Sequence, residues 1–220
     1  MTTVVIQCAG RKSPCAGYCR TKQGERVEFV ARPDEAPTSD RTVYARPDDV
    51  SDDGAHTWRQ RLLSYNAQPG ENVWSLLPAY KLYQPKQYRG LVDRFGAEQV
   101  FILSAGWGII RSDFLTPNYN ITLSRPSEKE GRYQWRRPGD HYDDFCHLPV
   151  DDTNPVIFLG GKNYLPLFEG LTGEIAARKT IYFRSTAIEQ HHGFIYEKYD
   201  CRHTMNWHYS CATDLIAGRL

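Results

Sequence analysis

The sequence lacks a long hydrophobic run, an excess of charge of one sign, and an N-terminal targeting pattern. None of its apolar runs approaches the roughly 20 residues that span a bilayer, and no signal-peptide pattern opens the chain. The formal net charge is only +1, so no global basic field points to nucleic acid. We therefore expect a soluble, cytoplasmic protein that does not associate with membranes.

The sequence also lacks the glycine signatures of the common nucleotide-binding and hydrolase folds. Gly160-Gly161-Lys162 is too short for a P-loop, and no Gly-x-Gly-x-x-Gly fingerprint is present. No Gly-x-Ser-x-Gly elbow occurs either. A nucleotide-hydrolysing motor, a Rossmann dehydrogenase and a serine hydrolase are therefore disfavoured.

The six cysteines do not have the paired spacing of a zinc ribbon or a zinc finger. Without a secretory signal, disulfides are not expected either. We predict reduced thiols, no metal and no cofactor; a zinc or iron–sulfur site is the alternative. Two clusters would have to supply such a site: Cys8, Cys15 and Cys19, and Cys201, His203, His208 and Cys211.

What the chain does contain is four short apolar runs that are rich in β-branched residues. Each run is nearly continuous rather than alternating, which is typical of parallel strands covered on both faces. Helix-like stretches separate the runs, so we predict one α/β domain over residues 1–220, with three α/β/α layers around a mainly parallel four-stranded sheet. The four runs are Thr3–Cys8, Gln99–Ala105, Pro155–Gly160 and Thr180–Ser185.

The expected helices show apolar residues at helical spacing or follow a glycine turn. The stretch Trp74–Arg94 contains Pro78 and Pro85, which should break it into pieces. The other expected helices are Trp58–Tyr65, Asn163–Leu171 and Trp207–Leu220.

Two segments depart from this alternation of strands and helices. An insertion at about residues 23–60 contains two strand-like runs, Val27–Asp34 and Thr42–Asp48, which we expect to pair as a hairpin. A long loop at about residues 124–149 is rich in aromatic and basic side chains. Loops longer than about 15 residues in a compact domain are usually functional or disordered, and the aromatic content favours an ordered, functional loop.

The most informative stretch is the apolar run that ends in Ser104 and opens into Trp107 and Gly108. Open α/β sheets bind ligands at the carboxyl ends of their strands, so an aromatic ring beside glycine backbone there could hold a flat ligand such as a nucleobase. A tight turn with a core tryptophan is the alternative. Gln7 and Cys8 should reach the same edge, where the amide of Gln7 suits the edge of a base.

Two kinds of group could carry chemistry at this edge. Asp113 is the carboxylate nearest the aromatic-glycine turn, and cleavage of an N-glycosidic bond needs a group that stabilises an oxocarbenium-like sugar and places a water. A turn or helix cap is the alternative role for Asp113. His208 lies between Asn206 and Tyr209 at the start of a predicted helix, and it can titrate near neutrality and donate to a leaving base.

Four segments of the chain resemble motifs of the YaaA peroxide-stress family and its shorter relatives. Residues 107–123 resemble the family pattern of an aromatic residue, Gly-Leu-Leu, an acid, and then a Tyr with a polar or charged neighbour. Residues 4–12 resemble the strand-Pro-Cys-Ser-Lys-Lys opening of the short relatives. Leu82–Pro85 with Tyr88 fits their middle motif, and Asn206–Tyr209 fits their C-terminal motif.

These matches are short but collinear, and their order is more specific than any one of them. One departure is Asn120, which stands where many relatives carry an acid. The resemblance implies a compact α/β protein that binds DNA, with kinship to uracil-DNA-glycosylase-like enzymes that act on base–sugar bonds.

We therefore expect a DNA glycosylase that flips a base out of double-stranded DNA, hydrolyses its glycosidic bond and leaves an abasic site. The long aromatic and basic loop would suit a bulky base such as glucosylated hydroxymethylcytosine, so an anti-phage enzyme is the sharpest version of this hypothesis. A non-catalytic DNA-binding stress protein and an enzyme acting on free nucleosides or nucleotides are the alternatives.

The expected site residues fall into three groups. The catalytic group is Asp113, His208 and Asn120. The base-binding group is Gln7, Cys8, Tyr83, Ser104, Trp107, Gly108, Tyr119, Asn206 and Tyr209. The phosphate-binding group, for which an ordinary solvated surface is the alternative, is Arg11, Lys12, Arg132, Arg136 and Arg137.

Overall fold

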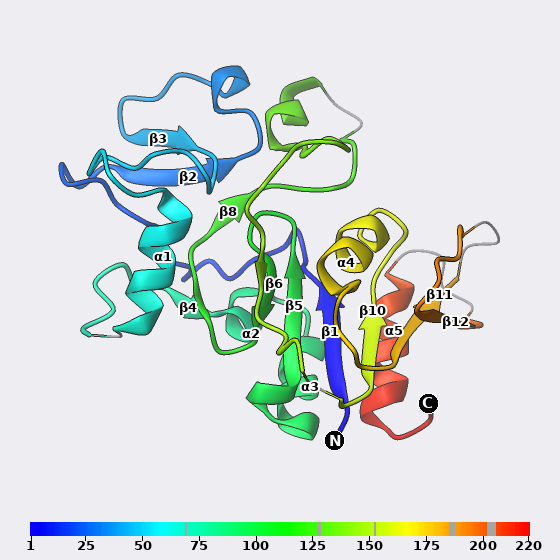
Figure 1. Ribbon diagram of the computed structural model, residues 1–220. Helices are drawn as coiled ribbons and strands as arrows, with labels where there is room; N and C mark the ends of the chain where they lie inside the picture. The colour runs from blue at the N-terminus through cyan, green and yellow to red at the C-terminus, as the bar shows by residue number, and fades with distance from the viewer. Residues whose placement is uncertain (69, 127–128, 152, 185–187, 202–205) are drawn as a thin grey trace.

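The computed structural model describes residues 1–68, 70–126, 129–151, 153–184, 188–201 and 206–220 (Figure 1). A seven-stranded sheet with the strand order β12-β11-β10-β1-β5-β6-β9 forms its centre. Ser185, the last residue of the fourth predicted strand, lies outside the described residues. The strands are β1 (Thr3–Gln7), β5 (Val100–Ser104), β6 (Gly108–Arg111), β9 (Phe145–Cys146), β10 (Val156–Leu159), β11 (Lys179–Phe183) and β12 (Phe194–Lys198).

The four predicted strands are adjacent and parallel. β1 pairs with β10 on one side and with β5 on the other, and β11 pairs with β10, all in parallel. Thr3–Ile6 of β1 and all of β5 are buried, as expected for strands covered on both faces. The prediction of an α/β fold is therefore confirmed.

The sheet is mixed and larger than the four-stranded sheet predicted. β6 runs antiparallel to β5, and β9 and β12 extend the two edges. The sequence pattern hides these strands for physical reasons. β12 is an edge strand in which partly buried and exposed positions mix, and β9 has only two residues, so neither gives a continuous apolar run.

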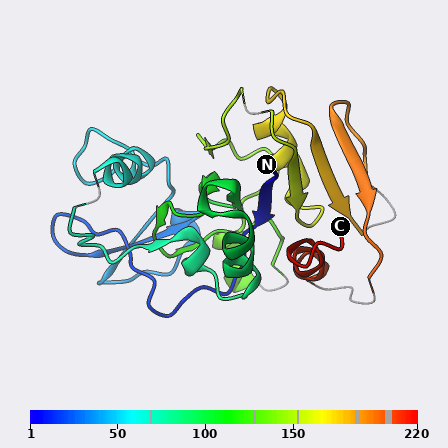
Figure 2. The same cartoon turned by 90° about the horizontal axis from the view of Figure 1, so that it is seen from below.

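Helices cover both faces of the sheet, which gives three layers (Figure 2). α3 (Gln87–Phe95) and α5 (Trp207–Ile216) pack against each other on one face, and α4 (Leu165–Thr172) covers the other. α5 docks through a stripe of buried residues at helical spacing. That stripe is His208, Cys211, Ala212 and Leu215.

Prolines set the helix boundaries before β5, as predicted. α2 (Ala79–Leu82) begins directly after Pro78, and α3 begins shortly after Pro85. α1 (Trp58–Ala67) begins at a capping box, in which the Thr57 hydroxyl accepts from the backbone of Gln60 and the Gln60 side chain accepts from the backbone of Thr57.

A small parallel sheet lies beyond the carboxyl ends of β1 and β5 (Figure 1). It contains β3 (Thr42–Ala45), β2 (Arg26–Val30) and β8 (Tyr119–Asn120), in that order. The predicted hairpin is wrong, because β2 and β3 are parallel. Residues 31–41 include a 3-10 helix at Pro33–Glu35 and are long enough to return the chain to the starting end of β2.

The segments between the main strands and helices carry short elements of their own. β4 (Leu77–Pro78) pairs with β7 (Leu115–Thr116), and the pairing of β2 with β8 joins the insertion to the chain that follows β7. Further 3-10 helices lie at Ala97–Gln99 and Lys129–Gln134. In the part of the chain that the structure describes, no helix is long and apolar enough to cross a bilayer.

The core contains several fully buried tyrosines. Three of the largest fully buried side chains are Tyr83, Tyr88 and Tyr119. A buried phenol needs a hydrogen-bond partner, so these rings bring polar groups into the interior just below the carboxyl edge of the sheet.

Candidate functional site

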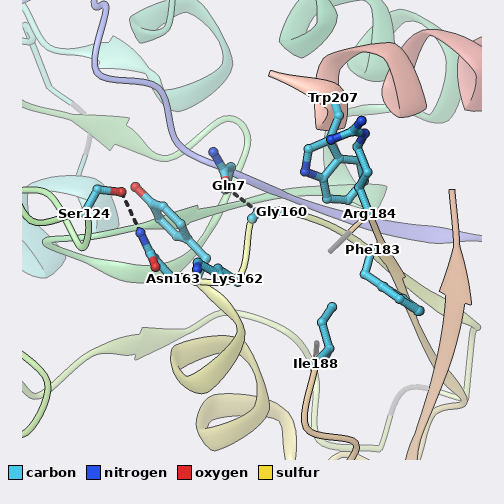
Figure 3. Close-up of a pocket in the computed structure, with 11 residues that line it drawn as sticks. Gln7, Ser124, Gly160, Lys162, Asn163, Phe183, Arg184, Ile188 and Trp207 are labelled. Carbon is cyan, nitrogen blue, oxygen red and sulfur yellow. Dashed lines mark hydrogen bonds between the residues drawn. The ribbon is translucent and has the colours of Figure 1, made fainter. Parts of the chain in front are cut away.

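A crevice opens at the carboxyl ends of β1, β10 and β11, and we call it the Gln7 crevice (Figure 3). The chain runs from β1 to β5 on one side and later places β10 on the other side of β1. This reversal is the point at which open α/β sheets bind ligands. The cavity volume is about 380 Å³, and the lining comprises Gln7, Ser124, Gly160, Gly161, Lys162, Asn163, Tyr164, Phe183, Arg184, Ile188 and Trp207.

The side chain of Gln7 is held on both sides. Its Oε1 accepts from the backbone N–H of Gly161 at 2.6 Å, and its Nε2 lies 3.3 Å from Nε2 of His208. An amide nitrogen can only donate, so Nε2 of His208 accepts and the ring is neutral. Gln7 is therefore a fixed wall of the crevice, and its amide ties α5 to the end of β10.

His208 does not titrate near neutrality, contrary to the expectation from the sequence. The side chain is buried on the inner face of α5, and this burial lowers the pKa of His208 to about 4. A neutral imidazole at pH 7 is a poor acid, so the proposed donation to a leaving base loses its basis. His208 acts as the acceptor that positions Gln7.

Cations and aromatic rings surround the mouth of the Gln7 crevice. Figure 3 shows Trp207, Arg184 and Phe183 on one side of Gln7, with Ser124 and Asn163 on the other. Lys162 lies in the turn that leads from β10 into α4. None of the described residues that line the crevice is a carboxylate. The crevice can hold an anion and an aromatic group, but it has no general base of the acidic kind.

A second cavity, of about 260 Å³, lies where β2 and β8 meet the segment after β1, and we call it the Lys12–Glu28 cavity. Segments 7–12 and 118–124 each supply residues to both cavities, so the two are neighbours. Its lining is strongly polar. The residues are Gly10, Lys12, Ser13, Pro14, Tyr18, Arg26, Glu28, Asn118, Tyr119 and Asn120.

Glu28 is the only carboxylate among the described residues that line this cavity. Its side chain is 13% exposed, and its two oxygens accept from Nη2 of Arg26 and from Nδ2 of Asn120, each at 2.7 Å. An ionised carboxylate offers about four acceptor positions, so Glu28 retains the capacity to bind a water or a substrate hydroxyl.

Lys12 lies in the same cavity and is fixed through its backbone. Residues Lys12 and Tyr83 form an antiparallel bridge, and the neighbouring N–H of Ser13 donates to the carbonyl of Leu82 at 2.7 Å. The Nζ atom lies 4.1 Å from the centre of the Tyr119 ring. Burial lowers the pKa of Lys12, a shift that the nearby Cys8 partly opposes.

A network of buried hydroxyls supports this cavity from below. The hydroxyls of Tyr83 and Tyr119 are 2.8 Å apart, and Ser104 Oγ donates to the Tyr119 hydroxyl at 2.9 Å. Burial raises the pKa of both tyrosines well above the ordinary value, so both stay protonated. Ser104 and Tyr83, expected to bind a base, are fully buried and hold the Tyr119 ring from below, whereas Tyr119 itself lines the cavity.

The remaining polar groups of the network lie toward the Gln7 crevice. The hydroxyl of Tyr88 donates to the carbonyl of Gln7 at 2.7 Å and lies 3.4 Å from the hydroxyl of Tyr209. The thiol of Cys8 is buried, 3.3 Å from the hydroxyl of Tyr164. Asn206 lies directly before α5 and is exposed to solvent. Its backbone adopts the left-handed conformation, with φ of 57°.

Trp107 and Gly108 are structural, so the expectation that they bind a base is wrong. Trp107 is fully buried, and its ring packs edge-on against Phe29 with centroids 5.0 Å apart. Gly108 has φ of +80°, and a Cβ there would lie 2.3 Å from the carbonyl oxygen of Phe145. The alternative, a tight turn with a core tryptophan, is what the structure contains.

Two arginines cap the carbonyls of this turn. Arg59 from α1 donates to the carbonyls of Gly106 at 2.9 Å and Trp107 at 3.2 Å, and pairs with Asp48. Arg136 donates to the carbonyl of Ala105 at 3.1 Å and forms a buried bidentate pair with Asp144. Arg136 is thus structural, and the prediction that it contacts phosphate is wrong.

Asp113 does not reach the carboxyl edge of the sheet. β6 folds back on β5 with Ser104 opposite Gly108 and Phe101 opposite Arg111, so the chain has returned to the amino end of β5 before Asp113. There Asp113 pairs with Arg111 on an exposed surface. The placement of Asp113 in the cleft is wrong because the turn leads into β6, which runs antiparallel to β5 and away from the cleft.

The other expected basic residues are on the surface. Arg11 and Arg132 are exposed, and Arg137 is exposed and pairs with Glu35 at 3.2 Å. Asn120, expected to be catalytic, is on the exposed side of β8 and donates to Glu28. Sequence reasoning missed Glu28 itself, because only the pairing of β2 with β8 brings it to the motif around Tyr119.

Metal ligands do not gather in the part of the chain described. Among those residues, no group of three or more His, Cys, Asp or Glu side chains is placed to hold an ion. His203, which belongs to one cluster considered above, lies outside the described residues.

Comparisons with protein-family models, with curated proteins and with solved structures found no match for this chain.

Proposed function

We propose that the protein is a DNA glycosylase whose active centre is the Lys12–Glu28 cavity. One observation carries this proposal: a largely buried carboxylate, Glu28, shares a polar cavity with two amide side chains and a lysine. The uracil-DNA-glycosylase-like arrangement of the layers, implied by the resemblance to the YaaA family, belongs to the same proposal.

The chemistry of base release matches what this cavity contains. As the bond from C1′ to the base breaks, the base leaves with the electron pair and the sugar gains positive charge. The carboxylate of Glu28 would balance that charge and accept a proton from the water that adds to C1′. The amides of Asn118 and Asn120 can donate to and accept from the departing base or its substituents.

The Gln7 crevice suits the flanking part of the strand. Lys162 and Arg184 supply positive charge, and Trp207 and Phe183 supply aromatic surface, which are the two features that bind single nucleotides without reading their sequence. We propose that a flipped nucleotide enters the Lys12–Glu28 cavity while a neighbouring phosphate occupies the crevice.

The substrate class that fits best is DNA with bulky, hydroxyl-rich bases, such as the glucosylated hydroxymethylcytosine of some phages. The Lys12–Glu28 cavity is lined almost wholly by hydrogen-bonding groups, whereas an ordinary base presents two flat apolar faces. Sugar hydroxyls attached to a base would satisfy those groups. An anti-phage role follows from this choice of substrate.

The test is to incubate the purified protein with unmodified DNA and with hypermodified phage DNA, and to measure released base and alkali-labile sites. We expect release from the modified DNA. Glu28→Gln should reduce the rate by about a hundredfold or more, the usual effect of removing a charge-stabilising or general-base group.

Asp113→Asn is the matched control, because Asp113 lies at the opposite edge of the sheet and should leave the rate unchanged. Circular dichroism should show that both variants fold. Release of no base from any DNA, with duplex binding intact, would contradict the proposal and favour the non-catalytic DNA-binding protein. Normal release by Glu28→Gln would move the catalytic role elsewhere.

One observation favours a second function, the cleavage of free nucleotides. The Gln7 crevice lies at the switch point of the sheet, and Gly160-Gly161-Lys162 leads into the start of α4, a geometry that suits a single phosphate group. Such an enzyme would release base from nucleotides with little dependence on salt, whereas an enzyme on duplex DNA would lose affinity steeply as salt rises.

A further inference from the structure

Lys12 is unusual because it shares a cavity with a carboxylate and does not pair with it. Glu28 accepts from Arg26 and Asn120 instead. Among the described residues, no acidic group forms an ion pair with Lys12, and its ammonium lies over the face of the Tyr119 ring. A lysine that only had to hold the fold together would be expected to take the nearby carboxylate.

The surroundings of Lys12 favour the neutral amine more than water does. Lys12 is partly withdrawn from solvent without a salt bridge to compensate, and this burial lowers the pKa of Lys12. The cation–π contact with Tyr119 and the nearby Cys8 work in the opposite direction, so the amine is activated rather than permanently neutral. A lysine of this kind is a typical nucleophile toward carbonyl carbon.

The position of the amine is also well defined. The backbone on both sides of Lys12 is hydrogen-bonded to residues 82–84: Ser13 N–H donates to Leu82, and Gln84 N–H donates to the carbonyl of Arg11 at 3.2 Å. The ring beneath Nζ is fixed in turn by the hydroxyls of Tyr83 and Ser104. This preorganisation is what covalent catalysis requires.

We propose that Lys12 forms a covalent imine with the abasic sugar and that the protein therefore also cleaves DNA at abasic sites. This inference rests on the proposed function for its substrate, the deoxyribose left in the Lys12–Glu28 cavity after base release. In its open form that sugar carries an aldehyde at C1′. The neutral amine of Lys12 adds through Nζ to C1′, and one of its protons moves to the oxygen. A second proton, from solvent, lets the oxygen leave as water, which gives a protonated imine.

The imine makes strand cleavage possible. It withdraws electrons from C2′, so the carboxylate of Glu28 can take a proton from that carbon. The electron pair moves to form the C1′–C2′–C3′ conjugated system, the C3′–O bond breaks, and the 3′ phosphate leaves with the bonding electrons. Water then hydrolyses the imine and regenerates the amine of Lys12.

The experiment uses a duplex oligonucleotide with one abasic site prepared in advance, so that it does not depend on base release by this protein. Sodium borohydride reduces an imine to a stable amine by transferring hydride to C1′. We expect the wild-type protein to be trapped on this DNA, with the adduct mapped to Lys12 by peptide mass. Lys12→Arg keeps the positive charge but cannot form the imine, and we expect neither adduct nor strand cleavage from it.

Lys81→Arg, an exposed position on α2, is the matched control and should be trapped like the wild type. DNA binding measured for the same proteins separates covalent chemistry from phosphate contact, since Lys12→Arg should still bind. Absence of an adduct with the wild type, or an undiminished adduct with Lys12→Arg, overturns the inference.

The two proposals fail separately. Base release from phage DNA without trapping on abasic DNA leaves the proposed function standing and overturns the imine. Trapping at Lys12 without base release from any DNA supports the imine and contradicts the glycosylase, since the protein would then act only on abasic sites formed by other means.

Discussion

The Trp107–Asp113 turn and the Lys12–Glu28 cavity differ in how their residues come together. The turn gathers an aromatic ring, a glycine and a carboxylate within one stretch of sequence, yet the ring is buried and the carboxylate pairs with Arg111 at the far edge of the sheet. The cavity combines segments that are distant in sequence, from β2, β8 and the chain after β1. Residues that are close in sequence here build the scaffold, and residues that meet only in the fold build the site.

The sharpest way to test this contrast is to remove Trp107. Trp107→Ala should lower the free energy of unfolding by about 3–5 kcal/mol, because it leaves a large cavity under the turn. Urea denaturation measures this decrease. Lys12→Met, at the cavity, should change the free energy of unfolding far less. A small decrease for Trp107→Ala would indicate that the ring is not part of the core.

Burial lowers the pKa of two histidines to about 4: His147, beside the turn, and His208, under the Gln7 crevice. Below the ordinary pKa near 6.5, the unfolded chain binds the proton and the folded chain does not, so stability falls as pH falls from about 6.5 to 4. Each histidine should contribute up to about 3 kcal/mol to this decrease.

Urea denaturation as a function of pH should show that His208→Gln and His147→Gln each remove part of this acid destabilisation. The double variant should lose the histidine part of the pH dependence in that window. If His208→Gln retains the full wild-type dependence, its neutral state in the folded protein is contradicted.

A smaller effect is expected from introducing an acid at position 120. Asn120→Asp would put a second carboxylate beside Glu28 and replace a donor by a like charge, which raises the apparent pKa values of the pair. The acid side of the pH–rate profile for base release should move to higher pH by about one unit. Asn118→Asp is the comparison variant, since the side chain of Asn118 donates to Tyr18 instead of to Glu28.

The smallest effect on the reaction should come from substitutions in the open Gln7 crevice. Lys162→Gln with Arg184→Gln should weaken DNA binding on all sequences and flatten the salt dependence, by about one unit of slope for each phosphate that is no longer neutralised. The rate at saturating DNA should change little, because these cations lie outside the Lys12–Glu28 cavity. An unchanged slope would mean that the crevice does not bind phosphate.

The sequence was sufficient for the features that depend on local pattern. Continuous apolar runs located β1, β5, β10 and β11, and prolines located the start of α2 and the neighbourhood of the start of α3. Because parallel strands end at a common edge, the pattern also placed Gln7 at a crevice of the kind that binds ligands.

The errors depend on pairing between distant segments, which periodicity does not report. The chain turns back at Gly108 into the antiparallel strand β6, so Asp113 lies at the amino end of β5 and not at the carboxyl end. A parallel pairing of β2 and β3 takes the place of the expected hairpin. No sequence motif marked Glu28 as a site residue, because its place beside Asn120 depends on the pairing of β2 with β8. Burial reversed the expectation for His208, whose pKa is set by the helix face it occupies.

The two arginines at the turn between β5 and β6 determine whether the insertion can be removed from this protein. Arg59 arises from the insertion and Arg136 from the long loop, and between them they satisfy three consecutive buried carbonyls. Excising residues 23–60 would therefore not leave a smaller working domain, because it would strip two acceptors of their donor inside the core. The insertion is an integral part of the fold and not an appendage, and shortened forms of the protein should be sought at other loops.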